Sequence, residues 1–278
     1  MSTPSGILVG YDGSTDADVA VEWAARAAQQ TQEPLQVAVV EDVGLTDGPG
    51  VWTEAYWDGV QIQATSALTA LGIDEPDVRR LKGRPVPVLL EHATAASLLV
   101  VGSRGHGRVG EVLLGSVSQH LAGHAPCPVA VVRVAERPSS ARIVVGMDGS
   151  GPAVRALEFA CRRASATGEK VVAVRGWRVG DVRVDQRGNI PASMSAHLME
   201  HERELSTWTS AARAKYPDIA IQEEVITVGS GHAVVDASAD ASLVVVGSRG
   251  RNAFTGMLLG STSHEVLHRA HCTVVVVR

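Results

Sequence analysis

The sequence Val100-Val101-Gly102-Ser103-Arg104-Gly105 occurs a second time, unchanged, as Val245-Val246-Gly247-Ser248-Arg249-Gly250. Each copy ends a short apolar run, and after a spacer of nine residues each is followed by Gly-Ser, at Gly115-Ser116 and at Gly260-Ser261. An internal repeat decides the architecture before any other feature, because each copy marks one structural unit. The 278-residue chain is therefore predicted to consist of two similar halves.

A second pair of motifs lies near the start of each half. Val9-Gly10-Tyr11-Asp12-Gly13-Ser14 matches Val145-Gly146-Met147-Asp148-Gly149-Ser150. The two pairs together predict two homologous domains, residues 1–137 and 138–278. The segment that joins them, 135–140, is short and has the composition of a linker, so we expect the two domains to pack together. The length agrees, since domains of roughly 150 residues are common.

Short apolar runs alternate with stretches of helical periodicity in both halves. Most of the runs are β-branched and continuous, as in a parallel sheet that is buried on both faces. They predict strands at 7–9, 35–40, 78–81, 98–101 and 129–134, and at 143–145, 171–174, 219–226, 243–246 and 273–277. Helices are expected at 16–30 and 152–167. We predict an α/β fold of two tandem, doubly wound, open parallel sheets with five strands each, which bind ligands beyond the carboxyl ends of their strands.

The composition excludes several classes of function. The net charge of −5 comes without any run of like charge, and aromatic residues make up only 4%, so no nucleic-acid surface is expected. No apolar run approaches the roughly 20 residues that span a bilayer, and the N-terminus lacks the pattern of a signal peptide. Cys127, Cys161 and Cys272 have no spacing typical of a metal site or a disulfide framework. These features favour a cytoplasmic protein.

The repeated glycine motif carries the chemistry. Glycine lets the backbone come close to a ligand, and successive free N–H groups form an anion-binding nest. The later Gly-Ser is expected to open a helix, whose N-terminus favours phosphate. A single glycine pattern after a strand would be weak support, but two copies at identical spacing are much stronger.

On these motifs the sequence resembles the universal stress protein family in its tandem two-domain form, over essentially the whole chain. The pattern Gly-x2-Gly-x9-Gly-Ser is typical of the ATP-binding branch of that family. The resemblance implies a five-stranded, Rossmann-like domain of the adenine nucleotide alpha hydrolase type, with ATP bound together with Mg²⁺ or Mn²⁺. It also implies dimer-like pairing through the last strand of each domain, 129–134 and 273–277, within the chain, with a homodimer of whole chains and a further protein partner left open.

The resemblance can be carried over residue by residue. In the first domain the matching positions are Asp12, near the ribose and phosphates; Val40, whose backbone contacts adenine; Val101, Gly102, Arg104 and Gly105, in the turn under the ribose and phosphates; and Gly115, Ser116 and Val117, at the β- and γ-phosphates. In the second domain they are Asp148, Gly176, Val246, Gly247, Arg249, Gly250, Gly260, Ser261 and Thr262. Gly176 and its neighbour Trp177 depart from the family pattern, and His106 and Arg108 are replaced by Arg251 and Ala253, so the two sites are expected to differ.

Each of these residues also has a purely structural explanation. Asp-Gly-Ser after a strand is ordinary turn and helix-capping chemistry, which would account for Asp12 and Asp148. Arg104 and Arg249 could be solvated loop cations, although in a phosphate-type nest they would offset the charge of a nucleotide.

Other residues are assigned structural roles. His197 to His201 match the H-x-x-E-H zinc pattern, but no second motif element follows, and an exposed polar helix face explains them better. Cys127 and Cys272, before the last strands, are expected to be small buried residues. The aromatic residues Trp52, Tyr56 and Trp57 are expected to cover a sheet edge or a domain interface. Pro85 and Pro87 are expected to set a turn and a helix start.

The sequence favours a binding protein over an enzyme. It contains no Walker A motif, and its three lysines, Lys82, Lys170 and Lys215, lie outside the glycine motifs. Phosphoryl transfer normally needs a cationic clamp, a positioned metal and a group that orients the nucleophile. Apart from Asp12 or Asp148 as a metal contact, no such set is evident, and no catalytic residue is predicted.

The first hypothesis is an ATP-binding stress sensor with one site per domain. The alternatives are a slow ATPase that uses the same sites and an interaction scaffold with vestigial pockets.

Overall fold

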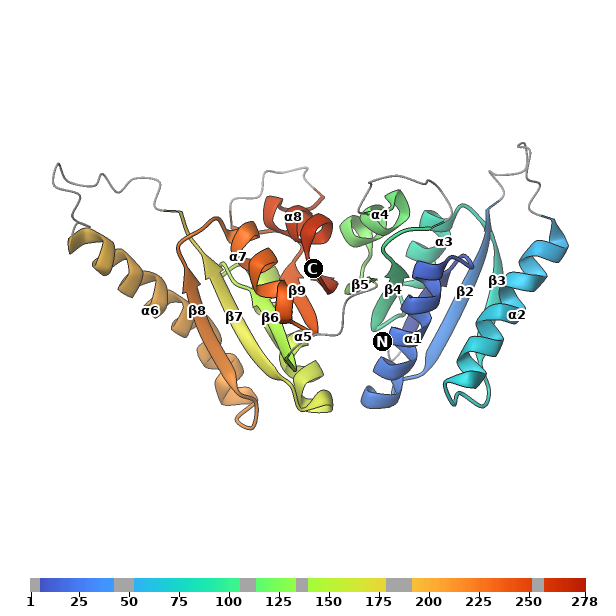
Figure 1. Cartoon of the computed structure of the whole chain (residues 1–278), viewed down its shortest axis with the longest axis horizontal. Helices are drawn as coiled ribbons and strands as arrows, with labels where there is room; N and C mark the ends of the chain where they lie inside the picture. The colour runs from blue at the N-terminus through green and yellow to red at the C-terminus, as the bar shows by residue number, and fades with distance from the viewer. Residues whose placement is uncertain (1–5, 43–52, 106–113, 134–139, 179–191, 252–257) are drawn as a thin grey trace. The chain divides into compact units, whose positions relative to one another are not determined.

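The computed structural model describes residues 6–42, 53–105, 114–133, 140–178, 192–251 and 258–278 (Figure 1). The chain divides into two compact units, Met1–Ala135 and Glu136–Arg278. This division lies two residues before the predicted boundary. Each unit is described separately below, as the first and second domain.

The first domain is an open parallel sheet with the strand order β3-β2-β1-β4-β5. Every strand pair within it is parallel. Its elements are β1 (Ile7–Tyr11), α1 (Thr15–Thr31), β2 (Leu35–Asp42), α2 (Glu54–Ala70), β3 (Asp77–Gly83), α3 (Pro85–His92), β4 (Leu98–Gly102), α4 (Ser116–His124) and β5 (Val129–Val132). The sheet is therefore the doubly wound type that the sequence predicts.

The second domain repeats this topology, with the strand order β10-β9-β6-β7-β8 and all pairs parallel. Its elements are β6 (Arg142–Gly146), α5 (Gly151–Thr167), β7 (Lys170–Gly176), α6 (Ala192–Lys215), β8 (Ile221–Ile226), α7 (Ser230–Ala237), a short 3₁₀ turn (Ser238–Asp240), β9 (Leu243–Gly247), α8 (Ser261–Arg269) and β10 (Thr273–Val277). Among the described elements α6 is the longest helix, with 24 residues, whereas α2, which occupies the same place in the order of the first domain, has 17.

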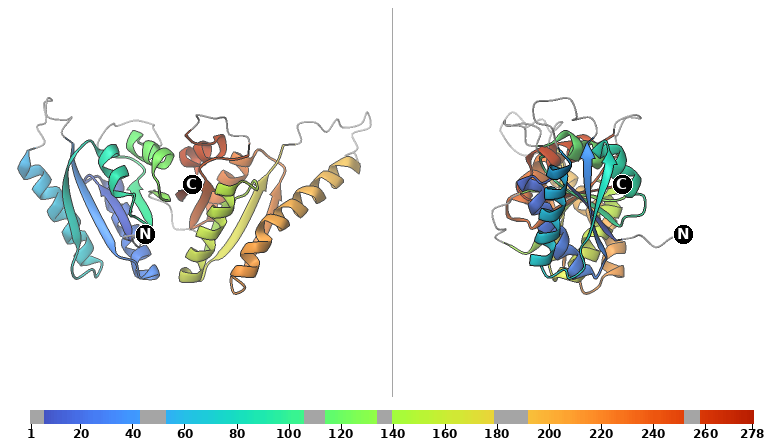
Figure 2. Two further views of the ribbon diagram at one scale, coloured as in Figure 1. Left: turned by 180° about the vertical axis from the view of Figure 1, so that it is seen from behind. Right: turned by 90° about the vertical axis from the view of Figure 1, so that its right-hand side faces the viewer.

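Helices cover both faces of each sheet. In the second domain α7 and α8 lie in front of the sheet in Figure 1, and the view from behind in Figure 2 brings α5 to the front. The strands between these layers are apolar almost without interruption: Ile143, Val144 and Val145 of β6 have no exposed surface. Burying each such side chain contributes roughly 1.5–3 kcal/mol, which is why continuous β-branched runs form the centre of each sheet.

The first helix of each domain starts at a capped serine. Ser14 Oγ accepts a hydrogen bond from the Ala17 N–H at 3.2 Å, and Ser150 Oγ accepts one from the Ala153 N–H at 3.3 Å. The faces that α1 and α5 turn to their sheets consist mainly of buried alanines. Small side chains let these two helices approach the sheet closely, and this brings their N-termini to the carboxyl ends of the central strands.

The structure corrects a few details of the sequence analysis. The strand expected at 219–226 begins only at Ile221, because the Ile219 N–H donates to the Tyr216 carbonyl in a turn that ends α6. The strand expected at 129–134 ends at Val132, and Val134 and the linker from it to Ser139 lie outside the described residues. α3 begins at Pro85, as predicted.

The structure places the three cysteines and two of the three aromatic residues that the sequence analysis singled out. Cys127, Cys161 and Cys272 are buried, and burial raises the pKa of Cys127 and of Cys161 to about 11. Tyr56 and Trp57 belong to α2, where their rings meet edge to face at 5.1 Å and Trp57 is buried. Trp52 lies outside the described residues. Across those residues, no helix combines the length and apolar character that a bilayer crossing requires.

Candidate functional site

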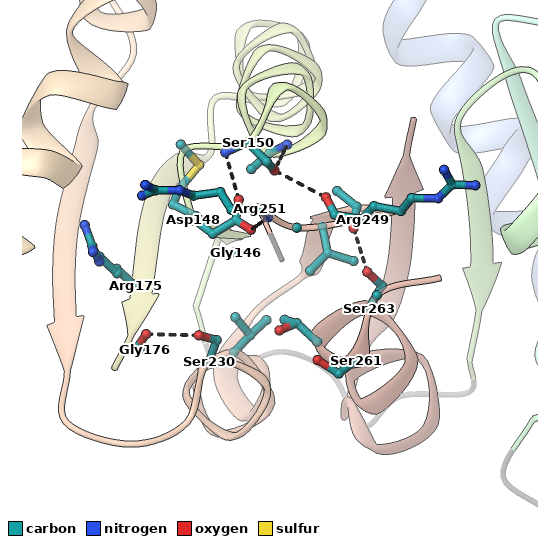
Figure 3. A pocket seen from close by; sticks show the side chains of 18 of the residues that line it. Gly146, Asp148, Ser150, Arg175, Gly176, Ser230, Arg249, Arg251, Ser261 and Ser263 are labelled. Carbon is teal, nitrogen blue, oxygen red and sulfur yellow. Dashed lines mark hydrogen bonds between the residues drawn. The ribbon is translucent and has the colours of Figure 1, made fainter. Parts of the chain in front are cut away.

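The second domain has a cavity of about 570 Å³ at the carboxyl ends of β6, β7 and β9 (Figure 3). The first residues of α7 and α8, Ser230 and Ser261, lie on its lower side in the figure, and Ser150 at the start of α5 lies on the upper side. The predicted positions of the second domain all line this cavity: Asp148, Gly176, Val246, Gly247, Arg249, Gly250, Gly260, Ser261 and Thr262. The structure thus brings together nine residues from three separate stretches of the sequence between positions 148 and 262.

Asp148 is held at the edge of the cavity by two backbone amides. Its Oδ1 accepts from the Ser150 N–H at 2.9 Å and its Oδ2 from the Arg251 N–H at 3.1 Å. Gly250 makes this possible, because a Cβ at that position would lie 2.4 Å from Asp148 Oδ2. The structural explanation of Asp148 as a turn residue and its predicted place in the site are therefore compatible. The same amides that form the turn orient a carboxylate that faces the cavity.

The N-terminus of α8 is joined to the loop after β9. The Gly260 N–H donates to the Ser248 carbonyl at 2.8 Å, and Ser263 Oγ donates to the Gly247 carbonyl at 2.6 Å. Gly260 is the N-cap residue, and no side chain caps the helix there. The first amides of α8 are consequently not occupied by a capping side chain, and the positive end of the helix dipole points to the cavity.

The two glycines of the loop have different roles. A Cβ on Gly247 would lie 2.8 Å from backbone atoms of Pro152 and Ala153, in the first turn of α5. Gly102 has the same relation to the backbone of Asp16 and Ala17 in α1. These glycines are needed for packing of the helix on the strand end, whereas Gly105 and Gly250 leave room for the carboxylates of Asp12 and Asp148.

Gly176 ends β7 at the position that Val40 holds in β2. The strand registers support this equivalence: Ile7 pairs with Leu35 and its counterpart Ile143 with Val171, and Val40 and Gly176 each lie five residues further along their strand. A Cβ on Gly176 would lie 2.6 Å from Ser230 Cα, and Ser230 Oγ donates to the Gly176 carbonyl at 3.0 Å. The departure from a branched residue thus has a physical cause: it allows the N-terminus of α7 to approach this strand end.

Sequence reasoning missed a charged cluster on one wall of the cavity. Arg175 contacts Glu204 of α6 at 2.5 Å and stacks over the Trp208 ring at 4.5 Å. Arg251 lies 4.0 Å from the same carboxylate. Burial raises the pKa of Glu204, but the hydrogen bond and charge of Arg175 outweigh it, and the pKa is lowered overall. The signal in the sequence was an arginine inside the otherwise apolar run of β7.

The two loop arginines point in opposite directions. In Figure 3 the Arg251 side chain extends toward the side where Arg175 lies, whereas the Arg249 side chain extends away from the other labelled residues. Arg249 lines the cavity without turning its guanidinium to the centre. Arg251, two positions further along the loop, is thus the better-placed cation.

The first domain repeats the core of the arrangement. Asp12 Oδ1 accepts from the Ser14 N–H at 3.0 Å, and a Cβ on Gly105 would lie 2.3 Å from Asp12 Oδ2. The Gly115 N–H donates to the Ser103 carbonyl at 2.7 Å, and Ser118 Oγ donates to the Gly102 carbonyl at 2.7 Å. Ser118 and Ser263, which the sequence analysis did not single out, stand at the same place in the repeat.

The remaining predicted positions of the first domain lie on the same strand and helix ends. Val40 and Val101 are buried near the carboxyl ends of β2 and β4, and Ser116 and Val117 open α4 after the N-cap residue Gly115. Arg104 is engaged by Asp16, whose Oδ2 lies 3.3 Å from the arginine Nε. His106 and Arg108 of the following loop, and Ala253 of its counterpart, lie outside the described residues.

The H-x-x-E-H residues lie on α6, and the described part of the chain contains no group of three or more side chains placed to hold a metal ion. The His201 ring packs against Trp177 at 4.7 Å, and its Nδ1 is 3.6 Å from Glu204 Oε2. His201 thus lies beside the charged cluster.

Known proteins agree with this architecture. The Universal stress protein family profile matches residues 5–133 and 140–278. One universal stress protein of Mycobacterium tuberculosis is 37% identical over 98% of this chain and 97% of its own length, and another is 35% identical over 98% and 96%.

Among solved structures, a universal stress protein from Archaeoglobus fulgidus covers 100% of this chain with 99% of its own, at a TM-score of 0.68 and 22% identity. At that identity the likeness shows the Rossmann-like fold alone, whereas the profile and the relatives show the family. The chain therefore belongs to the universal stress protein family and carries two tandem copies of the family's domain.

Proposed function

We propose that this stress protein binds ATP, one molecule per domain, and that occupancy of the sites is the signal it provides. The observation that carries the proposal is the cavity of the second domain, in which an oriented carboxylate, a glycine loop and the N-terminus of α8 surround one space. Its volume lies within the range of roughly 300–1,000 Å³ typical of small-molecule sites. The helix N-terminus and the loop amides suit an anionic, phosphate-bearing ligand.

The donor set also suits a metal that arrives with the nucleotide. Mg²⁺ is commonly held by one or two carboxylates together with phosphate oxygens and water. Asp148, oriented by two amides, is the carboxylate that would contact such an ion in the second domain, and Asp12 would do so in the first. The ion would supply charge neutralisation for the phosphates. This chain's own part is to place one carboxylate and one helix N-terminus around them.

Binding without efficient turnover is the form of activity that the residues support. None of the three lysines is among the residues that line the cavity, and the cations that do line it are arginines. Arg175 is engaged by Glu204, Arg251 lies 4.0 Å from the same carboxylate and Arg249 points away from the centre, so the described residues assemble no cationic clamp on a transferred phosphoryl group.

The experiment that tests the proposal is calorimetric titration of the purified full chain with Mg-ATP. We expect about two molecules per chain, about one for each single variant Gly115→Glu and Gly260→Glu, and none for the double variant. The new carboxylate would place bulk and negative charge at the helix N-terminus, where the phosphates are proposed to lie.

Gly59→Glu is the matched control, because it adds the same charge at an exposed helical glycine whose Cβ would meet nothing within 4 Å. It should leave the stoichiometry unchanged. Absence of binding to the wild-type chain at millimolar Mg-ATP, or full binding by the double variant, would contradict the proposal.

A further inference from the structure

The two domains differ at one residue next to the glycine loop. Ser14 and Ser150 cap α1 and α5 in the same way, and two residues further on the first domain has Asp16 where the second has Pro152. Both positions lie against the first loop glycine, since the backbones of Asp16 and Pro152 limit the space at Gly102 and Gly247. At the same place in the fold, the first domain therefore has an acidic residue and the second a neutral one.

Asp16 is bound to the loop of its own domain. Its Oδ2 accepts from Ser103 Oγ at 2.6 Å and from the Arg104 N–H at 3.0 Å, and it lies 3.3 Å from Arg104 Nε. The carboxylate is only 12% exposed. One amide of the anion-binding loop and the side chain of its arginine are thus engaged by an anion that the chain itself supplies.

The second domain lacks this internal anion. Pro152 has no acceptor in its side chain, and Ser150 Oγ instead donates to the Arg249 carbonyl at 3.3 Å. Among the described residues around the loop, the first domain has the carboxylates of Asp12 and Asp16 against one arginine, Arg104. The second has Asp148 against Arg249 and Arg251.

On this difference we propose that Asp16 is a specificity-determining residue, which lowers the affinity of the first domain for polyphosphate ligands so that the second domain fills first. The inference rests on the proposed function, because it concerns which of the two proposed ATP sites has the higher affinity and fills first. The mechanism is electrostatic: a largely buried carboxylate, bound to the loop under the proposed phosphate position, repels phosphates and reduces the attraction of the N-terminus of α1. AMP lacks the two outer phosphates that the loop and the helix N-terminus are proposed to hold, so the repulsion affects ATP more than AMP.

The test uses full-length chains in which one site is blocked. Gly260→Glu leaves the first site and Gly115→Glu leaves the second, and both are titrated with Mg-ATP and with AMP. We expect the first site to bind Mg-ATP about tenfold more weakly than the second. Adding Asp16→Asn to Gly260→Glu should recover most of that factor for Mg-ATP and much less for AMP. Asparagine removes the charge while its Oδ1 can still accept from Ser103 and Arg104.

Two further variants complete the test. Pro152→Asp in the Gly115→Glu chain is the reciprocal change, and it should weaken Mg-ATP binding at the second site. This variant tests the role of the carboxylate independently of whether the Asp16→Asn chain is stable. Glu22→Gln in the Gly260→Glu chain is the matched control, because it removes a charge from an exposed residue of the same helix that pairs with Arg26. It should change the affinity less than twofold.

The outcomes separate this inference from the proposed function. Equal Mg-ATP affinity at the two sites, no change on Asp16→Asn, or an equal gain for AMP and ATP would each overturn the role of Asp16 and leave ATP binding intact. Failure of the wild-type chain and of both single-site variants to bind Mg-ATP would overturn both.

Discussion

At the scale of single residues, the glycines of the repeated motif separate packing from ligand chemistry. Gly102 and Gly247 face backbone atoms in the first turns of α1 and α5, which cannot move without shifting the whole turn. Gly105 and Gly250 face only the tips of the Asp12 and Asp148 side chains. A motif that looks uniform in the sequence therefore consists of positions with distinct physical requirements.

This difference predicts opposite results for two alanine substitutions in the second domain. Gly247→Ala should lower the free energy of unfolding by about 1–3 kcal/mol, because its Cβ would overlap the backbone of Pro152 and Ala153. Gly250→Ala should leave the melting temperature nearly unchanged, because the Asp148 carboxylate can rotate away, but it should weaken Mg-ATP binding about tenfold. Thermal denaturation and titration of both variants in the Gly115→Glu chain measure the two effects. Equal loss of stability in the two variants would refute the distinction.

At the scale of elements, α6 is joined to the cavity wall through a charged contact that crosses from helix to strand. Glu204 of α6 accepts from Arg175 of β7, and His201 and Arg251 lie near the same carboxylate. The Arg175 stem and guanidinium also pack on Trp208. This contact fixes the long helix beside the site. Its strength should depend on pH, because the partners are ionisable.

The sign of that dependence follows from the lowered pKa of Glu204. A carboxylate whose pKa is below its ordinary value of 4.5 stabilises the fold above that pH, and the contribution is lost as the pH falls through the lowered pKa. The side chain is 38% exposed, so solvent screening limits the contribution to less than about 1 kcal/mol. Glu204→Gln should therefore reduce stability toward urea at pH 7, and its difference from the wild type should shrink below pH 4.5.

Urea titrations at pH 7 and at pH 4 measure this prediction. Glu202→Gln, at an exposed position on the same helix, serves as the control and should show no such pH-dependent difference. A deficit of Glu204→Gln that stays constant across this range would show that packing, rather than charge, holds α6 to β7.

How far the sequence could predict these elements depended on the periodicity of each segment. The strands were predictable because runs such as Thr273–Val277 are continuous and β-branched, and α1 and α5 because their small apolar residues recur at helical spacing. The cluster around Glu204 could not be predicted, since it joins residues of β7, α6 and the loop after β9, and nothing local to any of them indicates the others. Asp16 was hidden for the same reason: as a sequence feature it is an ordinary acidic residue in a first helical turn.

At the scale of the whole molecule, the repeat gives two domains that each contain a five-stranded sheet, its covering helices and a glycine loop at the strand ends. Within the second domain β10 is the edge strand next to β9. The Val277 carbonyl accepts from the Ser248 N–H. Backbone groups two residues apart in a strand point the same way, so the N–H and carbonyl of Val275 also point to β9. In a parallel strand the N–H groups of Val274 and Val276 then point to the other side, where this domain itself offers no strand.

This geometry predicts how the second domain behaves alone. A fragment of residues 138–278 should unfold cooperatively, because its core is complete, and it should elute from gel filtration as a dimer, because an apolar edge strand with outward amides pairs readily with another copy. Val276→Pro removes one outward donor without removing a bond to β9, and it should shift the fragment toward the monomer with little loss of stability. Val275→Pro is the matched control: it removes an inward donor and should destabilise the fragment by about 3 kcal/mol or more. A monomeric wild-type fragment, or a Val276→Pro fragment that remains dimeric, would show that the edge of β10 does not drive association.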